Sequence, residues 1–352
     1  MDSTSRPLIR WLDATVAAVA LAVVVGGITR LTESGLSITE WKPLAGMLPP
    51  MNAVEWDAAY QRFLLIPQAQ TIHAGITLPA FKGIFWWEWI HRQVARLVGL
   101  VIALPYFWFL IRRQIPSAYR LRLMAMPLLV AAQGALGWYM VSSGLSVRSN
   151  VSQYRLVAHL GLALVILVVA LWTSASLRAE RDAAAGADGA AKRRDVQRGA
   201  APWATLTMLF ALWTFGVILT GGFVAGLRAG KIYNTFPLMG GQVVPPGYWQ
   251  LPGFVANAFE NPAAAQFHHR VLAIVMVLAA YGLWYAAVRR LMPRSVLRAQ
   301  SWVAVAATAQ LALGIATLLL SVPVAIAALH QLVAVALLGA AVLAAHAARR
   351  IS

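Results

Sequence analysis

The chain has 352 residues, of which 60% are hydrophobic and 12% are charged, and 29 Lys and Arg against 12 Asp and Glu give a formal net charge of +17. These proportions exclude an ordinary soluble domain, in which about a quarter of the residues are charged. The absence of cysteine excludes disulfides, thiolate metal ligands and thiol catalysis, so any redox chemistry uses another group.

Eight apolar runs are long enough to cross the hydrocarbon layer of a membrane, which takes about 20 helical residues. We therefore predict an all-α, polytopic membrane protein with spans near residues 12–30, 81–111, 117–143, 153–177, 201–224, 264–288, 296–321 and 323–348.

Basic residues gather in alternate segments between these runs, for example at Arg112-Arg113, Arg178 and Arg289-Arg290. Membrane proteins keep such an excess on the cytoplasmic side. The pattern predicts that both termini are cytoplasmic, and it accounts for the positive charge without nucleic acid as a partner.

The first four runs contain residues that apolar spans rarely hold. In chain order these are Gly26-Gly27, then Glu88, His91 and Arg92, then Gln133, and last His159. An ionisable group inside a span is costly and is a functional hypothesis by default. After the fourth run, residues 179–200 are rich in Ala, Gly and charge, which predicts a cytoplasmic linker.

The last four runs repeat this pattern in the same order. The matches, 195, 178, 177 and 171 residues apart, are Gly26-Gly27 with Gly221-Gly222, His91-Arg92 with His269-Arg270, Gln133 with Gln310, and His159 with His330. Four spans return a chain to the side it left, so both halves enter the membrane in the same sense. We predict two pseudo-symmetric four-helix bundles, formed by residues 1–178 and 201–352.

The four matched histidines are candidate haem ligands. Each lies at a depth of roughly 8–15 Å from the outer side, so the parallel helices of one bundle present two imidazoles at one level. Imidazole is a common axial ligand of haem iron, which makes His91 and His159 one pair and His269 and His330 the other. The alternatives are hydrogen bonding to nearby carbonyls, packing among aromatics, or copper or another metal, although no Met or carboxylate cluster accompanies the pairs.

Glu88 is the only acid placed deep within a span, one helical turn before the first candidate ligand. The matched position in the second half holds Gln266, so we expect chemistry in the first bundle and electron transfer in the second. The alternative for Glu88 is a buried ion pair with Arg92 or Arg96.

Arg92 and Arg270 directly follow candidate ligands and are candidate partners of haem propionates, because a guanidinium binds a carboxylate through a two-pronged fork. The alternative is that their charged ends reach to the membrane surface or, for Arg92, pair with Glu88. Of the other histidines, His268 is expected to be a packing residue, His346 an interfacial residue and His73 a loop residue.

Longer motifs then become recognisable in both halves. They are Gly26-Gly27-Ile28-Thr29-Arg30-Leu31-Thr32-Glu33-Ser34-Gly35 and its continuation to Pro43, Met47-Leu48-Pro49-Pro50, Phe85-Trp86-Trp87-Glu88-Trp89-Ile90-His91-Arg92, Asn234-Thr235-Phe236-Pro237-Leu238-Met239 and Gln266-Phe267-His268-His269-Arg270. Together they resemble the haem A synthase family of cytochrome oxidase assembly enzymes. Without a cysteine pair in the first outer loop, the chain is similar to the cysteine-free branch of proteobacteria and mitochondria.

This resemblance implies a reaction, its cofactors and a location in the bacterial inner membrane. The family oxidises the C8 methyl group of haem O to a formyl group through a hydroxymethyl intermediate. Substrate haem O would lie between His91 and His159 with Glu88 as the proton-handling carboxylate, and a low-spin haem b would lie between His269 and His330. A quinol or another redox partner would supply electrons, and a haem O synthase would be a candidate partner.

Two other functions stay open on the residues alone. A membrane di-haem electron-transfer cytochrome would use the same four histidines but has no evident use for an acid on one side. A haem carrier or transporter would also suit a duplicated bundle.

Overall fold

The computed structural model describes residues 5–40, 45–145, 150–184, 186 and 200–351, and regular structure in these ranges is helical apart from one isolated bridge between Met239 and Gln242. Eight helices are long and apolar enough to cross a membrane, which confirms the predicted polytopic all-α class. They are α1 (Ser5–Leu31), α4 (Leu78–Ile111), α5 (Arg120–Ser142), α6 (Gln153–Ala184), α7 (Ala200–Gly226), α9 (Pro262–Arg289), α10 (Arg294–Leu319) and α11 (Val324–Arg349).

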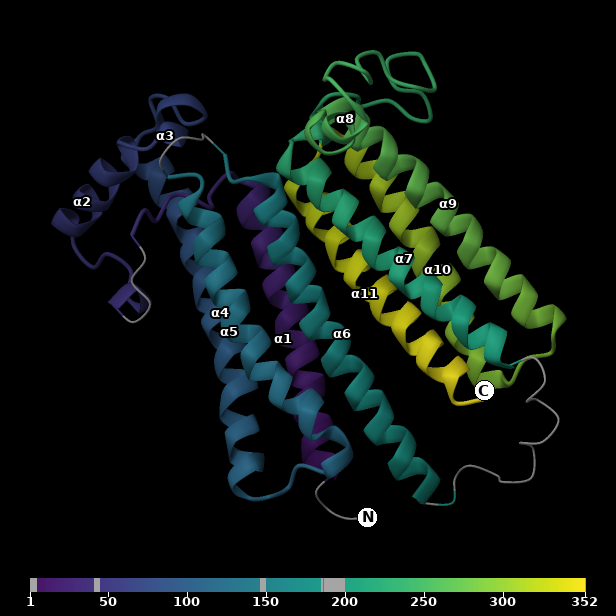
Figure 1. Ribbon diagram of the computed structural model, residues 1–352. Helices are drawn as coiled ribbons and strands as arrows, with labels where there is room; N and C mark the ends of the chain where they lie inside the picture. The colour runs from purple at the N-terminus through teal and green to yellow at the C-terminus, as the bar shows by residue number, and fades with distance from the viewer. Residues whose placement is uncertain (1–4, 41–44, 146–149, 185, 187–199, 352) are drawn as a thin grey trace.

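These helices form two groups of four, each a closed ring of contacts (Figure 1). In the first bundle α1 contacts α4, α4 contacts α5, α5 contacts α6, and α6 contacts α1. In the second bundle α7, α9, α10 and α11 follow one another in the same way. The groups meet along a seam where α1 packs on α11 and α6 packs on both α7 and α11.

Proline positions explain where several of the helices begin. Pro262 occupies the first turn of α9, where a missing backbone N–H costs nothing, and the side chain of Asn261 accepts a hydrogen bond from Ala263 N at 2.9 Å. Pro293 and Pro323 immediately precede α10 and α11.

Large apolar side chains are exposed on the outer faces of the helices, including Leu104 and Ile111 of α4, Leu128 of α5 and Leu278 of α9. A soluble protein rarely exposes such surface continuously, whereas hydrocarbon tails cover it without cost. The protein is therefore an integral membrane protein.

Short helices cap one end of the molecule, opposite the end where α1 begins and α11 ends (Figure 1). They are α2 (Ala53–Leu64), α3 (Pro67–Thr71), η5 (Ala229–Lys231) and α8 (Phe254–Glu260). Of the other two, η1 (Ala45–Met47) lies beside α4, with Met47 O 3.3 Å from Gln93 Nε2, and η2 (Ser117–Tyr119) leads into α5. Beneath α2 and α3, the side chains of Leu36, Phe63, Phe81 and Phe85 form a small apolar core. This end of the first bundle is thus a folded cap rather than a loose loop.

Helix α6 continues to Ala184, so it extends into the segment 179–200 that the composition assigned to a linker. Residue 185 and residues 187–199 of that predicted linker lie outside the described residues.

Candidate functional site

The four paired histidines lie on α4, α6, α9 and α11, and each imidazole is seated against a glycine of a neighbouring helix. An added Cβ would lie 2.8 Å from His91 Cε1 at Gly26, and 3.0 Å from the Cε1 atoms of His159, His269 and His330 at Gly137, Gly221 and Gly314. Real Cβ atoms essentially never approach a neighbour within 3.0 Å, and a contact of 3.0 Å is tighter than nine in ten, so a larger residue at these positions would require the ring to shift. The repeat-matched glycines and histidines therefore form one recurring contact.

The ring nitrogens at these seats are largely unused by the protein. Within the described part of the chain, the buried Nδ1 atoms of His91, His159 and His330 have no hydrogen-bond partner, whereas His269 Nδ1 lies 2.8 Å from Thr220 Oγ1. The matched glutamines lie nearby, with Gln133 Nε2 3.4 Å from His159 Nε2 and Gln310 Nε2 3.3 Å from His330 Nε2. Buried polar atoms without partners call for a further group, so these imidazoles fit a ligand that takes ring nitrogens.

The histidines of each bundle also lie within electrostatic reach of each other, His91 with His159 and His269 with His330. Among the described residues, no three or more His, Cys, Asp or Glu gather as a metal site would require. Two imidazoles are too few for a structural zinc site, which needs four ligands. They suffice for haem iron, because the porphyrin supplies the equatorial nitrogens.

Glu88 is buried with 2% of its surface exposed, and both of its carboxylate oxygens are occupied. Oε2 accepts hydrogen bonds from Ser37 Oγ and Ile38 N, both at 2.7 Å. Oε1 accepts from Arg92 Nη2 at 2.6 Å and from Arg92 Nε at 3.1 Å. The ion pair that the sequence offered as one alternative for Glu88 is thus present, and it fastens the chain after α1 to α4.

In each bundle, the arginine that follows the first candidate ligand donates hydrogen bonds to backbone carbonyls of a loop in the same bundle. Arg92 donates to Ile38 O at 2.8 Å and to Glu40 O at 3.1 Å. Arg270 donates to Tyr233 O at 2.7 Å and to Thr235 O at 2.8 Å. The acceptors of the second pair stand 195 residues after those of the first, which is also the spacing of Gly26 and Gly221. The same clamp therefore occurs in both halves.

Gln266 takes the place of Glu88 in the second clamp. Its Nε2 donates to Tyr233 O at 3.2 Å, and its buried Oε1 has no partner in the ranges that the structure describes. The first site therefore has a carboxylate where the second has an amide.

A cavity of about 220 Å³ opens beside Arg92 at the capped end of the first bundle. It is bounded by the loop that Arg92 holds and by the end of α5, and its lining residues are Ile38, Thr39, Glu40, Arg92, Trp138, Val141, Ser142 and Leu145.

The second glycine of each Gly-Gly pair serves the seam between the bundles. A Cβ at Gly27 would overlap the side-chain amide of Gln331, whose Nε2 donates to Val23 O at 3.0 Å. A Cβ at Gly222 would lie 3.3 Å from Leu160 Cδ2. Gln331 and Leu160 each follow the ligand candidate on the last helix of the opposite bundle. One glycine thus faces a histidine of its own bundle and the next faces the other bundle.

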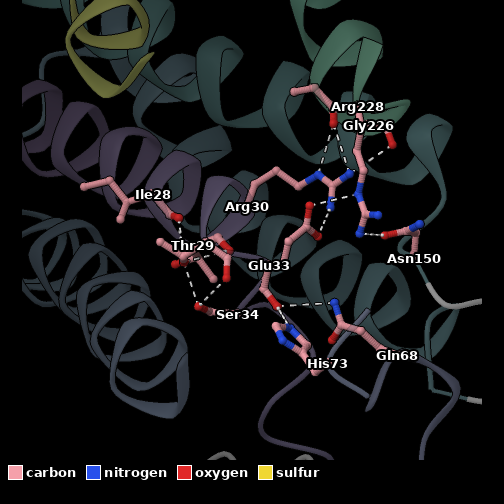
Figure 2. A network of polar contacts seen from close by, with 12 residues as sticks. Ile28, Thr29, Arg30, Glu33, Ser34, Gln68, His73, Asn150, Gly226 and Arg228 are labelled. Atoms are coloured by element: carbon pink, nitrogen blue, oxygen red, sulfur yellow. Dashed lines mark hydrogen bonds and ion pairs between the residues drawn. The ribbon is translucent and has the colours of Figure 1, made fainter. Parts of the chain in front are cut away.

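An ionic network closes this seam at the capped end (Figure 2). Glu33 forms ion pairs with Arg30 and Arg228, both at 2.8 Å, and Arg228 also donates to Asn150 Oδ1 at 2.7 Å. Arg30 donates to the carbonyl oxygens of Ala225 and Gly226, each at 3.0 Å. Because Glu33 follows α1 and Arg228 follows α7, these contacts join the two bundles.

The other three histidines have protein partners, in keeping with their expected roles. His268 Nε2 lies 2.6 Å from Tyr248 Oη, His346 Nε2 lies 3.2 Å from Ser176 Oγ, and His73 Nε2 lies 3.2 Å from Glu33 O.

Residues 9–342 match the family model described as cytochrome oxidase assembly protein. A relative named heme A synthase from Parvibaculum lavamentivorans is 42% identical over 341 residues, which cover 97% of this chain and 94% of the relative. Proteins of the same name from Nitrosospira multiformis and Caulobacter sp. strain K31 are 40% and 43% identical, covering 99% and 98% of this chain and 95% and 97% of the relatives.

Proposed function

The chain belongs to the family of cytochrome oxidase assembly proteins, and from that membership we propose that it is a haem A synthase, a membrane oxidoreductase that acts on haem O. It oxidises the C8 methyl group of haem O to a formyl group through a hydroxymethyl intermediate. The observation that carries this proposal is the recurring seat of a histidine against a glycine, twice in each bundle, in a chain whose full-length relatives bear this name.

We place substrate haem O between His91 and His159 and a resident haem b between His269 and His330. The unpartnered ring nitrogens and the glycine seats support both assignments. A bound haem b would supply one-electron transfer, and the side chains described above would hold and orient the two macrocycles. This gives residues 1–178 the substrate site and residues 201–352 the cofactor site.

Glu88 is the proposed proton-handling residue of the first site, because the second bundle has an amide at the matched position. Glu88 contacts Arg92 and the loop at Ser37 and Ile38. Movement of a proton at Oε2 would therefore change the hydrogen bonds that hold this loop. Arg92 and Arg270 are the proposed neighbours of the haem propionates. The cavity beside Arg92 supports this for the first site.

The remaining parts of the proposal concern the surroundings of the enzyme. We place it in a bacterial inner membrane with both termini cytoplasmic, which the basic segments support. Molecular oxygen is the proposed oxidant, a quinol or another redox partner supplies the two electrons that each monooxygenation consumes, and a haem O synthase supplies the substrate.

The test is haem extraction and chromatography after expression with and without a supply of haem O. The wild-type protein is expected to yield haem A only when haem O is supplied. Glu88→Gln should lower conversion by at least about 100-fold, the usual scale of acid–base catalysis, while the low-spin haem b spectrum remains. His269→Ala should abolish that spectrum, whereas His268→Ala, one residue away, should preserve it.

Both alternative functions make different predictions in the same experiment. A di-haem cytochrome would bind haem without forming haem A, and a carrier would return haem O unchanged. Loss of the low-spin spectrum in both Glu88→Gln and His269→Ala would contradict the division of labour between the bundles.

A further inference from the structure

One hydrogen bond distinguishes His269 from the other three candidate ligands. Thr220 Oγ1 lies 2.8 Å from His269 Nδ1, while the buried Nδ1 atoms of His91, His159 and His330 have no partner among the described residues. The four rings share their glycine seats, so this difference does not come from a different fold around His269.

The direction of this bond follows from the single proton of a hydroxyl group. Thr220 Oγ1 is also 2.7 Å from Val217 O, and a carbonyl can only accept. Because the hydroxyl donates to Val217, it must accept from His269. His269 therefore carries its proton on Nδ1, and its Nε2 lone pair is free for a metal.

The repeat supplies a natural comparison at this position. The spacing of 195 residues that joins Gly26 to Gly221 places Val25 opposite Thr220. Valine offers no acceptor, which accounts for the unpartnered Nδ1 of His91. The two bundles thus differ at the one residue that decides whether the first ligand of each pair is oriented.

We propose that Thr220 is a positioning residue that makes the second site a permanent haem site, and that Val25 leaves the first site able to exchange its haem. This inference rests on the proposed function and deepens it. A ligand histidine whose other nitrogen donates a hydrogen bond is held in one orientation and is a stronger base. A site that must release its product is better served by a ring without that restraint.

The experiment compares Thr220→Val and Thr220→Ser in the full-length protein loaded with haem b. The readouts are the rate at which haem passes to excess apomyoglobin and the midpoint potential of the low-spin haem. Thr220→Val should release haem about tenfold faster, the lower end of the usual effect of such partners. If the substitution also weakens the preference of the site for ferric over ferrous iron tenfold, the midpoint potential of the haem rises by about 59 mV. Thr220→Ser keeps the hydroxyl and should behave as the wild type.

Thr214→Val is the matched control, because Thr214 lies on the same helix and its hydroxyl donates to the backbone oxygen of Phe210 at 2.9 Å. It should change neither readout. The reciprocal variant Val25→Thr should slow haem release from the first site. A Thr220→Val protein with wild-type release and potential would overturn the inference while leaving the proposed function intact. If the wild-type protein held no low-spin haem that depends on His269, the proposed function itself would fail.

Discussion

A glycine backbone touches each of the four paired imidazoles, and the contact leaves no room for a Cβ atom. In ordinary helices the substitution of glycine by alanine is favourable by about 1 kcal/mol. At these seats the added methyl group must instead displace the ring. Substitution of glycine by alanine should therefore be unfavourable where the glycine contacts an imidazole and favourable where it has no close neighbour.

Gly221→Ala and Gly216→Ala, both on α7, test this expectation. A Cβ at Gly221 meets the His269 ring, whereas a Cβ at Gly216 meets nothing within 4 Å. Overpacking typically costs about 1–3 kcal/mol, so Gly221→Ala should weaken retention of low-spin haem by about 5- to 100-fold. Haem content per purified protein, read from the absorption spectrum, is the measurement. Equal haem content in the two variants would mean that the His269 ring can move aside without weakening haem binding.

At the level of elements, the arginines of α4 and α9 anchor the loops that follow α1 and α7. Arg270 holds Tyr233 and Thr235 by two carbonyl contacts. Hydrogen bonds to charged groups are worth about 1.5–3 kcal/mol each. The loop should open readily once this arginine is removed.

Arg270→Ala is expected to speed amide hydrogen exchange in residues 232–240 by about 10- to 100-fold. Exposed Arg289 on the same helix provides the control, since Arg289→Ala removes an equal charge without touching the loop. Hydrogen exchange followed by mass spectrometry measures the exchange rate in both variants. Unchanged exchange in Arg270→Ala would assign the order of this loop to other contacts.

The long helices could be predicted because an apolar span is set by composition over 20 or more residues. The short helices were missed, although α2 carries a legible local signal. The Asn52 side chain caps α2 by accepting from Glu55 N at 2.9 Å, and the Glu55 side chain accepts from Met51 N at 2.8 Å, which resembles a capping box shifted back by one residue. A search for membrane spans passes over such polar signals.

The site shows the same division between what the sequence contains and what only the packing reveals. The matched glycines and histidines were evident, but their contact was not, because it depends on how neighbouring helices are turned. The bond from His269 to Thr220 was invisible for the same reason. The assignment of haem ligands and of Glu88 as a catalytic residue stays a prediction.

At the scale of the whole molecule, the two bundles are joined by an apolar seam and by the network around Glu33. The backbone at Glu33 and Arg228 is left-handed, with φ of 53° and 54°, directly after α1 and α7. Such residues end helices sharply. Both side chains are thereby directed to the seam, where they form their ion pair (Figure 2).

A double-mutant cycle with Glu33→Gln and Arg228→Gln measures what this pair contributes. We expect a coupling free energy of about 1 kcal/mol, because the side chains are only 19% and 33% exposed and share a wider network. Unfolding in mixed detergent micelles is the measurement. The pair of Glu40 and Arg62, 3.5 Å apart and 41% and 45% exposed, is the comparison and should show coupling near zero. Similar coupling free energies in both pairs would mean that the ion pair between the bundles stabilises the protein no more than an exposed pair does.

The paired glycines of α1 and α7 have a consequence for signalling between the two sites. His91 touches Gly26, and Gln331, the neighbour of His330, touches the adjacent Gly27. The glycine pair of α1 and the Gln331 side chain of α11 therefore lie between the two proposed haem sites at that height. Binding of haem at one proposed site should therefore cause a small shift in the absorption spectrum of the haem at the other site, although the two haems do not touch.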